Sequence, residues 1–179
     1  MRPPEHLAFA LIPLIGYTLV RYRRPPTGYA MLYVVLATQL PDLIDKPLAW
    51  TFGIIPSGRM LAHSIVLSGP LLCLGYLLAL RRGRGRPAAV FSLAYLSHLV
   101  GDFYPILTQG TDYYFFPNLF WPLLEANPDH TPSFAAHFSG DLSSLLVPLV
   151  MFSLVMCYIV GDILWRSGTK RADLPSPPL

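Results

Sequence analysis

The sequence predicts an all-α membrane protein, and three observations support this prediction. Of its 179 residues, 53% are hydrophobic and only 13% are charged, whereas a soluble domain usually carries about 25% charged residues. Five apolar runs are long enough to span or nearly span a hydrocarbon core, which takes about 20 helical residues. Basic residues gather in the connectors that follow alternate runs. We therefore expect an integral membrane bundle of about five transmembrane helices with one large aromatic external loop.

The five runs make up one predicted transmembrane helical domain, residues 1–166. In chain order they are His6–Tyr22, Gly28–Ile44 with room to continue to Trp50, Met60–Leu80, Pro87 to about Leu107, and about Leu142 to Trp165. The first run begins after Pro4, because proline is tolerated in the first turn of a helix. Residues 167–179 contain three prolines and little apolar material, so we expect a disordered cytoplasmic tail.

The charge distribution predicts the orientation in the membrane. Ten of the 13 Lys and Arg residues follow the first, third and fifth runs, and the other three (Arg2, Lys46 and Arg59) lie at the opposite ends of the helices. Cytoplasmic loops carry the excess of basic residues in membrane proteins. The N-terminus is therefore expected outside and the C-terminus in the cytoplasm of a multi-pass cell-membrane protein. Basic residues spread over three connectors argue against nucleic-acid binding.

The longest connector, Thr108–Gly140, is predicted to be external. It contains Tyr113-Tyr-Phe-Phe116 and Phe120-Trp121, and aromatic rings favour the membrane–water interface. A short helix or loop in the interface and an aromatic cap packed over the bundle both fit this composition. His130, His137 and Asp141 also belong to this region, and for them we favour a solvated external loop.

Titratable residues recur near the external end of four runs. They are His6, Asp42 with Asp45, His63 with Ser64, and His98 with Asp102. At 1.5 Å per residue, they lie roughly 16 to 25 Å from the cytoplasmic end of their runs. Charged residues are costly inside a bilayer unless something binds them. We therefore expect one shared polar site just under the external surface.

The local spacings favour a metal site. His98 and Asp102 are four residues apart and face one side of a helix, as do Asp42 and Asp45 if the helix continues past Pro41. Arg59 and His63 show the same spacing at the expected start of the third helix. Imidazole and carboxylate together are ligands for zinc and for harder ions such as manganese. The predicted ligands of a divalent ion are His6, Asp42, Asp45, His63, His98 and Asp102.

Each of these residues also has a simpler interpretation. His6 would be an interfacial histidine, and the two aspartates of the second run would end a helix with Lys46 and Arg59 as ion-pair partners. His63 and Ser64 would be packed residues at a helix start. His98 and Asp102 would form a hydrogen bond within their helix.

Taken in order, these blocks resemble a known family, the LexA-regulated, inner-membrane-associated metal-dependent hydrolases, also called YdjM-like. That family has an N-terminal histidine followed by L-P-D-x-D-H, H-R-G-x-T-H-S and S-H-x-x-x-D blocks. Its matches here lie within about residues 1–105: His6, Leu40-Pro41-Asp42 with Asp45, Arg59 with His63-Ser64, and Ser97-His98 with Asp102.

The chain departs from the family pattern at four positions. The second aspartate of the first block comes one residue late, and Lys46 stands where the family often has histidine. Gly58 and Ala62 replace a histidine and a threonine of the next block. With two fewer histidines, the site would hold its metal more weakly or hold one ion instead of two.

The leading functional hypothesis is a membrane-embedded, metal-dependent hydrolase acting on an ester or phosphoester, either a small molecule or a membrane lipid. A carboxylate, Asp45 or Asp102, would act as general base. Arg59 would hold a phosphate or carboxylate group, and Ser64 would donate a hydrogen bond. The alternative is a non-enzymatic membrane protein in which the same groups form a metal-ion or proton relay, or a structural ion-pair cluster.

Overall fold

The protein is all-helical over the residues that the structure describes, with no strand among them. A computed structural model describes residues 3–130 and 143–168. Its long helices are α1 (Pro3–Tyr22), α2 (Gly28–Lys46), α3 (Ile65–Arg81), α4 (Gly85–Phe103) and α8 (Ser143–Gly168). Short turns of helix are η1 (Pro47–Thr51), α5 (Ile106–Gln109), η2 (Gly110–Asp112) and α6 (Phe116–Leu119). The all-α prediction is therefore confirmed.

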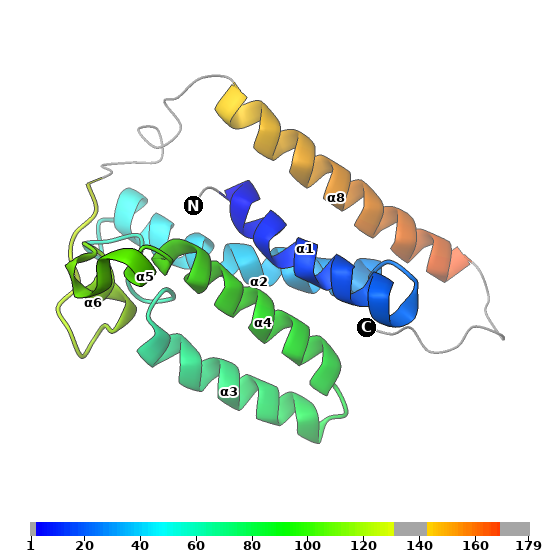
Figure 1. Cartoon of the computed structure of the whole chain (residues 1–179), viewed down its shortest axis with the longest axis horizontal. Coiled ribbons are helices and arrows are strands. Elements are labelled where there is room, and N and C mark those ends of the chain that lie inside the picture. The colour runs from blue at the N-terminus through cyan, green and yellow to red at the C-terminus, as the bar shows by residue number, and fades with distance from the viewer. Residues whose placement is uncertain (1–2, 131–142, 169–179) are drawn as a thin grey trace.

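Helix α2 lies at the centre of the bundle (Figure 1) and packs against α1, α4 and α8, while α3 packs on α4. The core between these helices is built from aliphatic and small side chains, including Leu7, Val34, Ala37, Leu99 and Ile159. The short segments α5 and α6 gather at one end of the bundle, around the C-terminal ends of α2 and α4. That end contains the polar residues predicted to form the site.

The opposite end is closed by a polar contact between α8 and the start of α2. Asp162 accepts hydrogen bonds from the Gly28 amide at 2.7 Å and from Arg166 Nε at 2.6 Å. A Cβ atom at Gly28 would lie 2.7 Å from the carbonyl oxygen of Ile159, so only glycine permits this approach. The nearby α3–α4 turn contains Gly83 with φ of 69°, a left-handed conformation that favours glycine.

The five-span prediction is supported only in a coarser form. By length and composition, one described helix, α8 over Leu146–Gly168, can cross a membrane, and α4 with the bent α5–η2 segment makes a second candidate. Helix α3 is apolar but has only 17 residues. Charged residues near the ends of α1 and α2 lower the hydropathy of those helices. The other expected spans therefore remain predictions.

The two largest differences between predicted and observed helix boundaries concern the third and fourth runs. The third run was expected to begin at Met60, but α3 begins at Ile65, and residues 60–64 form a loop. The fourth run was expected to reach Leu107, but α4 ends at Phe103, and the chain bends by 48° before α5 and η2. Pro105 at the bend has no amide hydrogen to continue the helical pattern.

Candidate metal centre

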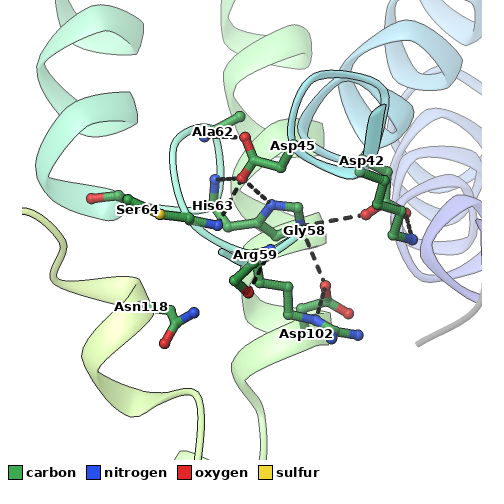
Figure 2. Close-up of polar contacts among 12 residues, drawn as sticks. Asp42, Asp45, Gly58, Arg59, Ala62, His63, Ser64, Asp102 and Asn118 are labelled. Atoms are coloured by element: carbon green, nitrogen blue, oxygen red, sulfur yellow. Dashed lines mark hydrogen bonds and ion pairs between the residues drawn. The ribbon is translucent and has the colours of Figure 1, made fainter. Parts of the chain in front are cut away.

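Four of the six predicted metal ligands come together. Asp42 on α2, His63 in the 52–64 loop, and His98 and Asp102 on α4 each place one ligand atom within 4.8 Å of the others, and all four are buried. We call these four residues the ligand group. Figure 2 shows the His63 ring facing both Asp42 and Asp102, with dashed lines to both. Separate segments of the chain thus bring these His and Asp side chains together, although His63 comes from a loop and not, as predicted, from a helix.

The distances within the ligand group fit a four-coordinate ion. His63 Nε2 lies 3.0 Å from His98 Nε2, 3.4 Å from Asp42 Oδ1 and 3.3 Å from Asp102 Oδ2. His98 Nε2 lies 3.8 Å from each of the same carboxylate oxygens. Ligands about 2.1 Å from a tetrahedral ion are separated by about 3.4 Å from one another. These five distances, 3.0 to 3.8 Å, lie around the spacing that a zinc-like ion requires.

Hydrogen bonds on the far side of each imidazole decide which nitrogen faces the group. His98 Nδ1 lies 2.6 Å from the carbonyl oxygen of Thr38, which can only accept, so Nδ1 carries the hydrogen. His63 Nδ1 lies 2.8 Å from Asp45 Oδ2 and donates to it. In the neutral rings both Nε2 atoms then present lone pairs to the centre. Such partners fix the tautomer and orientation of metal-binding histidines.

These lone pairs need a cation between them. Two unprotonated Nε2 atoms 3.0 Å apart would repel each other. Either one of them therefore holds a proton, or a metal ion lies between them. Asp42 Oδ1 is buried and has no hydrogen-bond partner among the described residues, although a buried polar atom is normally satisfied. The residues present therefore fit a divalent metal ion, on both geometry and donor chemistry.

Asp45 is fully buried but lies behind His63 instead of within the ligand group. Besides His63 Nδ1, its carboxylate accepts hydrogen bonds from the amides of Met60 at 2.9 Å, Ala62 at 2.9 Å and His63 at 3.2 Å. Both oxygens are thus used to fold the loop and to aim the imidazole (Figure 2).

The same contacts correct one sequence expectation. Arg59 and His63 were expected on one face at the start of the third helix. Both lie instead in the 52–64 loop, because Asp45 binds three amides of that loop and holds it in place. Ser64 caps α3 by accepting from the amides of Val66 and Leu67, and it donates to the carbonyl oxygen of Trp121. The structure therefore does not bring the Ser64 hydroxyl, predicted as a catalytic donor, to the ligand group.

His6 on α1 lies directly beside the ligand group. Its ring stacks on that of His98 with centroids 3.9 Å apart, and Nε2 lies 3.1 Å from Asp102 Oδ1, the oxygen that points away from His63. His6 is 1% exposed, and neither ring nitrogen meets hydrogen-bond geometry with any described partner. The structure thus places His6 against a ligand residue and not among the four converging atoms.

Two cations pair with the two carboxylates of the ligand group. Lys46 Nζ lies 2.5 Å from Asp42 Oδ2, and Arg59 Nε lies 3.0 Å from Asp102 Oδ2. The ion-pair partners considered from the sequence are therefore present alongside the cluster. The Lys46 side chain is 7% exposed and that of Arg59 is 22% exposed, so Arg59 lies closer to the solvent.

The charges around His63 and Arg59, in the loop outside the long helices, shift their titration. Burial alone lowers the pKa of the His63 imidazole, but hydrogen bonds to three surrounding carboxylates outweigh burial and raise that pKa to about 10. Burial also lowers the pKa of the Arg59 guanidinium, but the adjacent Asp102 carboxylate outweighs this and raises it. Both shifts show that the carboxylates favour positive charge at the centre.

The aromatic segment after α4 is attached to the site at several points that the sequence reasoning missed. The Tyr113 hydroxyl donates to the carbonyl oxygen of Asp102 at 3.1 Å, and Arg59 lies over the Phe115 ring at 5.0 Å. Asp129 accepts from Trp50 Nε1, Ser57 Oγ and the Gly58 amide at 2.8, 3.1 and 2.6 Å. Asp129 stands beside other polar residues of this connector, such as Asn127 and His130, so no local pattern pointed to this contact.

The remaining predicted loop residues contribute nothing to the ligand group in the described part of the chain. His130 is exposed and packs its ring against Tyr114, with centroids 4.7 Å apart, as expected for an external loop residue. His137 and Asp141 lie outside the described residues. Helix α8 continues to Gly168 and so includes the first two residues of the predicted tail, residues 167–179. Tail residues 169–179 lie outside the described residues.

Comparison with known proteins assigns the chain to a family. The chain matches the YdjM inner membrane protein family over residues 1–168. The chain belongs to this family. The match covers the helices that supply the ligand group and extends beyond the blocks quoted from the sequence, to the end of α8. No curated protein and no solved structure matches the chain.

Proposed function

We propose that this YdjM-family protein is a membrane-embedded, metal-dependent hydrolase that acts on an ester or phosphoester of a membrane lipid. The observation that carries the proposal is the ligand group itself. Four donor atoms from three separate segments converge in a buried place, and the partners of the two histidines direct both Nε2 lone pairs inward. Membership of an inner membrane protein family supports the location.

The residues divide into ligands and residues that position them. Asp42, His63, His98 and Asp102 would hold the ion, with zinc favoured by the four-coordinate spacing and manganese the alternative. Asp45 and the Thr38 carbonyl hold the two imidazoles in place. A divalent ion bound there supplies Lewis-acid chemistry and lowers the pKa of a water molecule toward neutrality.

Catalysis also needs one coordination position that can open, since catalytic zinc sites keep a place for water or substrate. Asp102 is the best candidate to vacate its position. Its Oδ2 atom already pairs with Arg59 Nε at 3.0 Å, and its Oδ1 atom lies 3.1 Å from His6 Nε2. After leaving the ion, Asp102 would stay paired with Arg59 and His6, and it would accept the proton of the attacking water.

Arg59 is the proposed contact for the substrate. Its side chain is the partly exposed cation beside the ligand group. The planar guanidinium presents five donors and suits the paired oxygens of a phosphate or carboxylate. The lipid head group would approach past Arg59 and the aromatic segment that includes Phe115, which packs on it.

For the membrane arrangement we propose the five-span topology, with the site near the external face. Large apolar side chains are exposed on every long helix, for example Val20 on α1, Leu43 on α2, Leu71 on α3, Leu93 on α4 and Leu149 on α8. Exposed apolar area of this extent favours a lipid environment. Reporter fusions after Arg24 and Arg86 should both report the cytoplasm. An external signal at either position would invert or break the topology.

A structural metal centre without catalysis is the second candidate. The observation that favours it is that four protein donors already surround the centre, as in closed structural zinc sites. A metal or proton transporter is a third outcome that the same purified protein can reveal, through ion flux in vesicles.

The test begins with metal content. Full-length protein purified in detergent should contain close to one divalent ion per chain by elemental analysis. His98→Ala with Asp42→Ala should contain less than about 0.1 ion per chain, because two of the four ligands are gone. Metal below about 0.1 ion per chain in the wild type would refute the metal centre.

The second stage separates enzyme from binder. A panel of lipid phosphoesters and carboxyl esters in mixed micelles should reveal at least one substrate whose hydrolysis stops on chelation and returns with one metal. Arg59→Lys keeps the charge but loses the planar fork, and it should weaken binding of that substrate more than it changes metal content. Bound metal with no hydrolysis across the panel would favour the structural centre.

A further inference from the structure

Lys46 has an unusual position for an ammonium group. Its side chain is 7% exposed, and Nζ lies 2.5 Å from Asp42 Oδ2. The other oxygen of the same carboxylate, Oδ1, points into the ligand group, 3.4 Å from His63 Nε2. Asp42 therefore lies between Lys46 on one side and the proposed position of the metal ion on the other. A carboxylate that bridges two metal ions divides its oxygens in the same way.

The space around Lys46 is filled by protein. The Trp50 ring lies 5.5 Å from Nζ. A Cβ atom added at Gly58 would meet the Lys46 side chain at 3.1 Å, Asp129 Oδ2 at 3.0 Å and Trp50 at 3.3 Å. A metal-binding side chain at position 58 would therefore fit only if these neighbours shifted. A second ion on this side of Asp42 would have to displace the lysine.

The charges of the cluster balance with one ion. Among the described residues, these contacts link four carboxylates, Asp42, Asp45, Asp102 and Asp129, with two cations, Lys46 and Arg59. With neutral histidines, one divalent ion brings the sum to zero, and a second would leave two uncompensated positive charges. Buried charges are strongly disfavoured unless they are paired.

We propose that Lys46 is a built-in cation that occupies the place of a second metal ion, so that the centre holds a single divalent ion. This inference rests on the proposed metal centre and sets its stoichiometry. The ammonium neutralises the outer oxygen of Asp42, keeps that carboxylate in its bridging orientation, and excludes a further ion from the same side.

The test is a titration of the metal-free full chain in detergent with Mn²⁺ and, separately, Zn²⁺. Elemental analysis after desalting gives the stoichiometry, and calorimetry gives the dissociation constant. Wild type should saturate at one ion per chain. Two tightly bound ions in wild type would overturn the role of Lys46 and leave the metal centre intact, whereas no bound ion would refute the metal centre itself.

Three variants sharpen the result. Lys46→His replaces the ammonium by a neutral donor, frees Asp42 Oδ2, and should raise the stoichiometry to two. Lys46→Met removes the charge at similar length and should lower the dissociation constant of the first ion at least tenfold. Lys46→Arg keeps the charge and should stay within about threefold of wild type, as should the control Arg82→Met on the exposed turn. If Lys46→Met binds like Lys46→Arg, the charge of residue 46 has no effect on the ion and the inference is wrong.

Discussion

The two ends of the helical bundle both contain carboxylates with little solvent exposure, but they use them differently. At the end where α8 meets the start of α2, Asp162 is matched by the Arg166 side chain and by the Gly28 amide. At the other end, the ligand group places two imidazole lone pairs and two carboxylate oxygens around a common point. One cluster is satisfied by donors of the chain itself, and the other by a cation at its centre, either a proton on His63 or a metal ion.

The comparison separates a structural polar contact from a binding site. A buried carboxylate is costly unless donors surround it, and the donors around Asp162 come from the chain itself. The ligand group also has cations: Lys46 pairs with the outer oxygen of Asp42, and Arg59 pairs with Asp102 Oδ2, one of the inward atoms. The two Nε2 atoms and Asp42 Oδ1 face one another at 3.0 to 3.8 Å, which is the arrangement that a metal ion stabilises.

The largest expected effect is on the ligand group itself. His98→Ala removes a donor whose orientation is fixed by the Thr38 carbonyl. We expect metal affinity to fall by more than about 100-fold, beyond the loss typical of a supporting residue. Calorimetry on metal-free protein measures it. The matched control is Asp162→Ala at the far end, and an equal loss of affinity in both variants would show that the two ends do not differ.

A supporting residue should give a smaller loss. Asp45→Asn keeps the size of the side chain but weakens its hold on His63 Nδ1 and on the loop amides. Metal affinity should fall about 10- to 100-fold, as for other carboxylates that orient metal-binding histidines. Unchanged affinity in a variant that purifies as a folded monodisperse species would show that Asp45 serves only the loop.

Metal binding should depend on pH through His63. Because the pKa of this ring is raised to about 10 without metal, the ring holds a proton that the ion must displace. Apparent affinity should therefore rise by up to about tenfold per pH unit between pH 6 and 9. In metal-free protein the same proton stabilises the fold below the ordinary pKa of 6.5, and this contribution disappears as pH rises through about 10. A flat affinity profile would contradict a protonated His63.

The smallest effect on metal is expected at the far end. Asp162→Ala leaves the Gly28 amide and Arg166 without their acceptor and should destabilise the protein by about 1–3 kcal/mol. Metal stoichiometry should not change. Thermal denaturation in detergent measures the first quantity and elemental analysis the second. A loss of metal here would mean that α8 positions the ligand group.

Much of the site could be predicted from the sequence because depth along a helix is a local property. A rise of 1.5 Å per residue places His6, Asp42 and His98 at a common level once the runs alternate in direction. The spacing of four residues between His98 and Asp102 puts both on one face. The helical class followed from apolar runs bounded by basic connectors. Of the five predicted spans, the described helices support one or two by length and composition.

The sequence by itself determined that imidazoles and carboxylates meet at one end of an all-helical bundle. Only the tertiary structure decided the part that each one plays. Asp45 and Asp42 are three residues apart on α2, yet one binds loop amides and the other faces the ligand group, because the 52–64 loop folds against a single side of that helix. Which side a loop covers depends on contacts between distant segments, such as Asp129 with Gly58, and no local pattern encodes it.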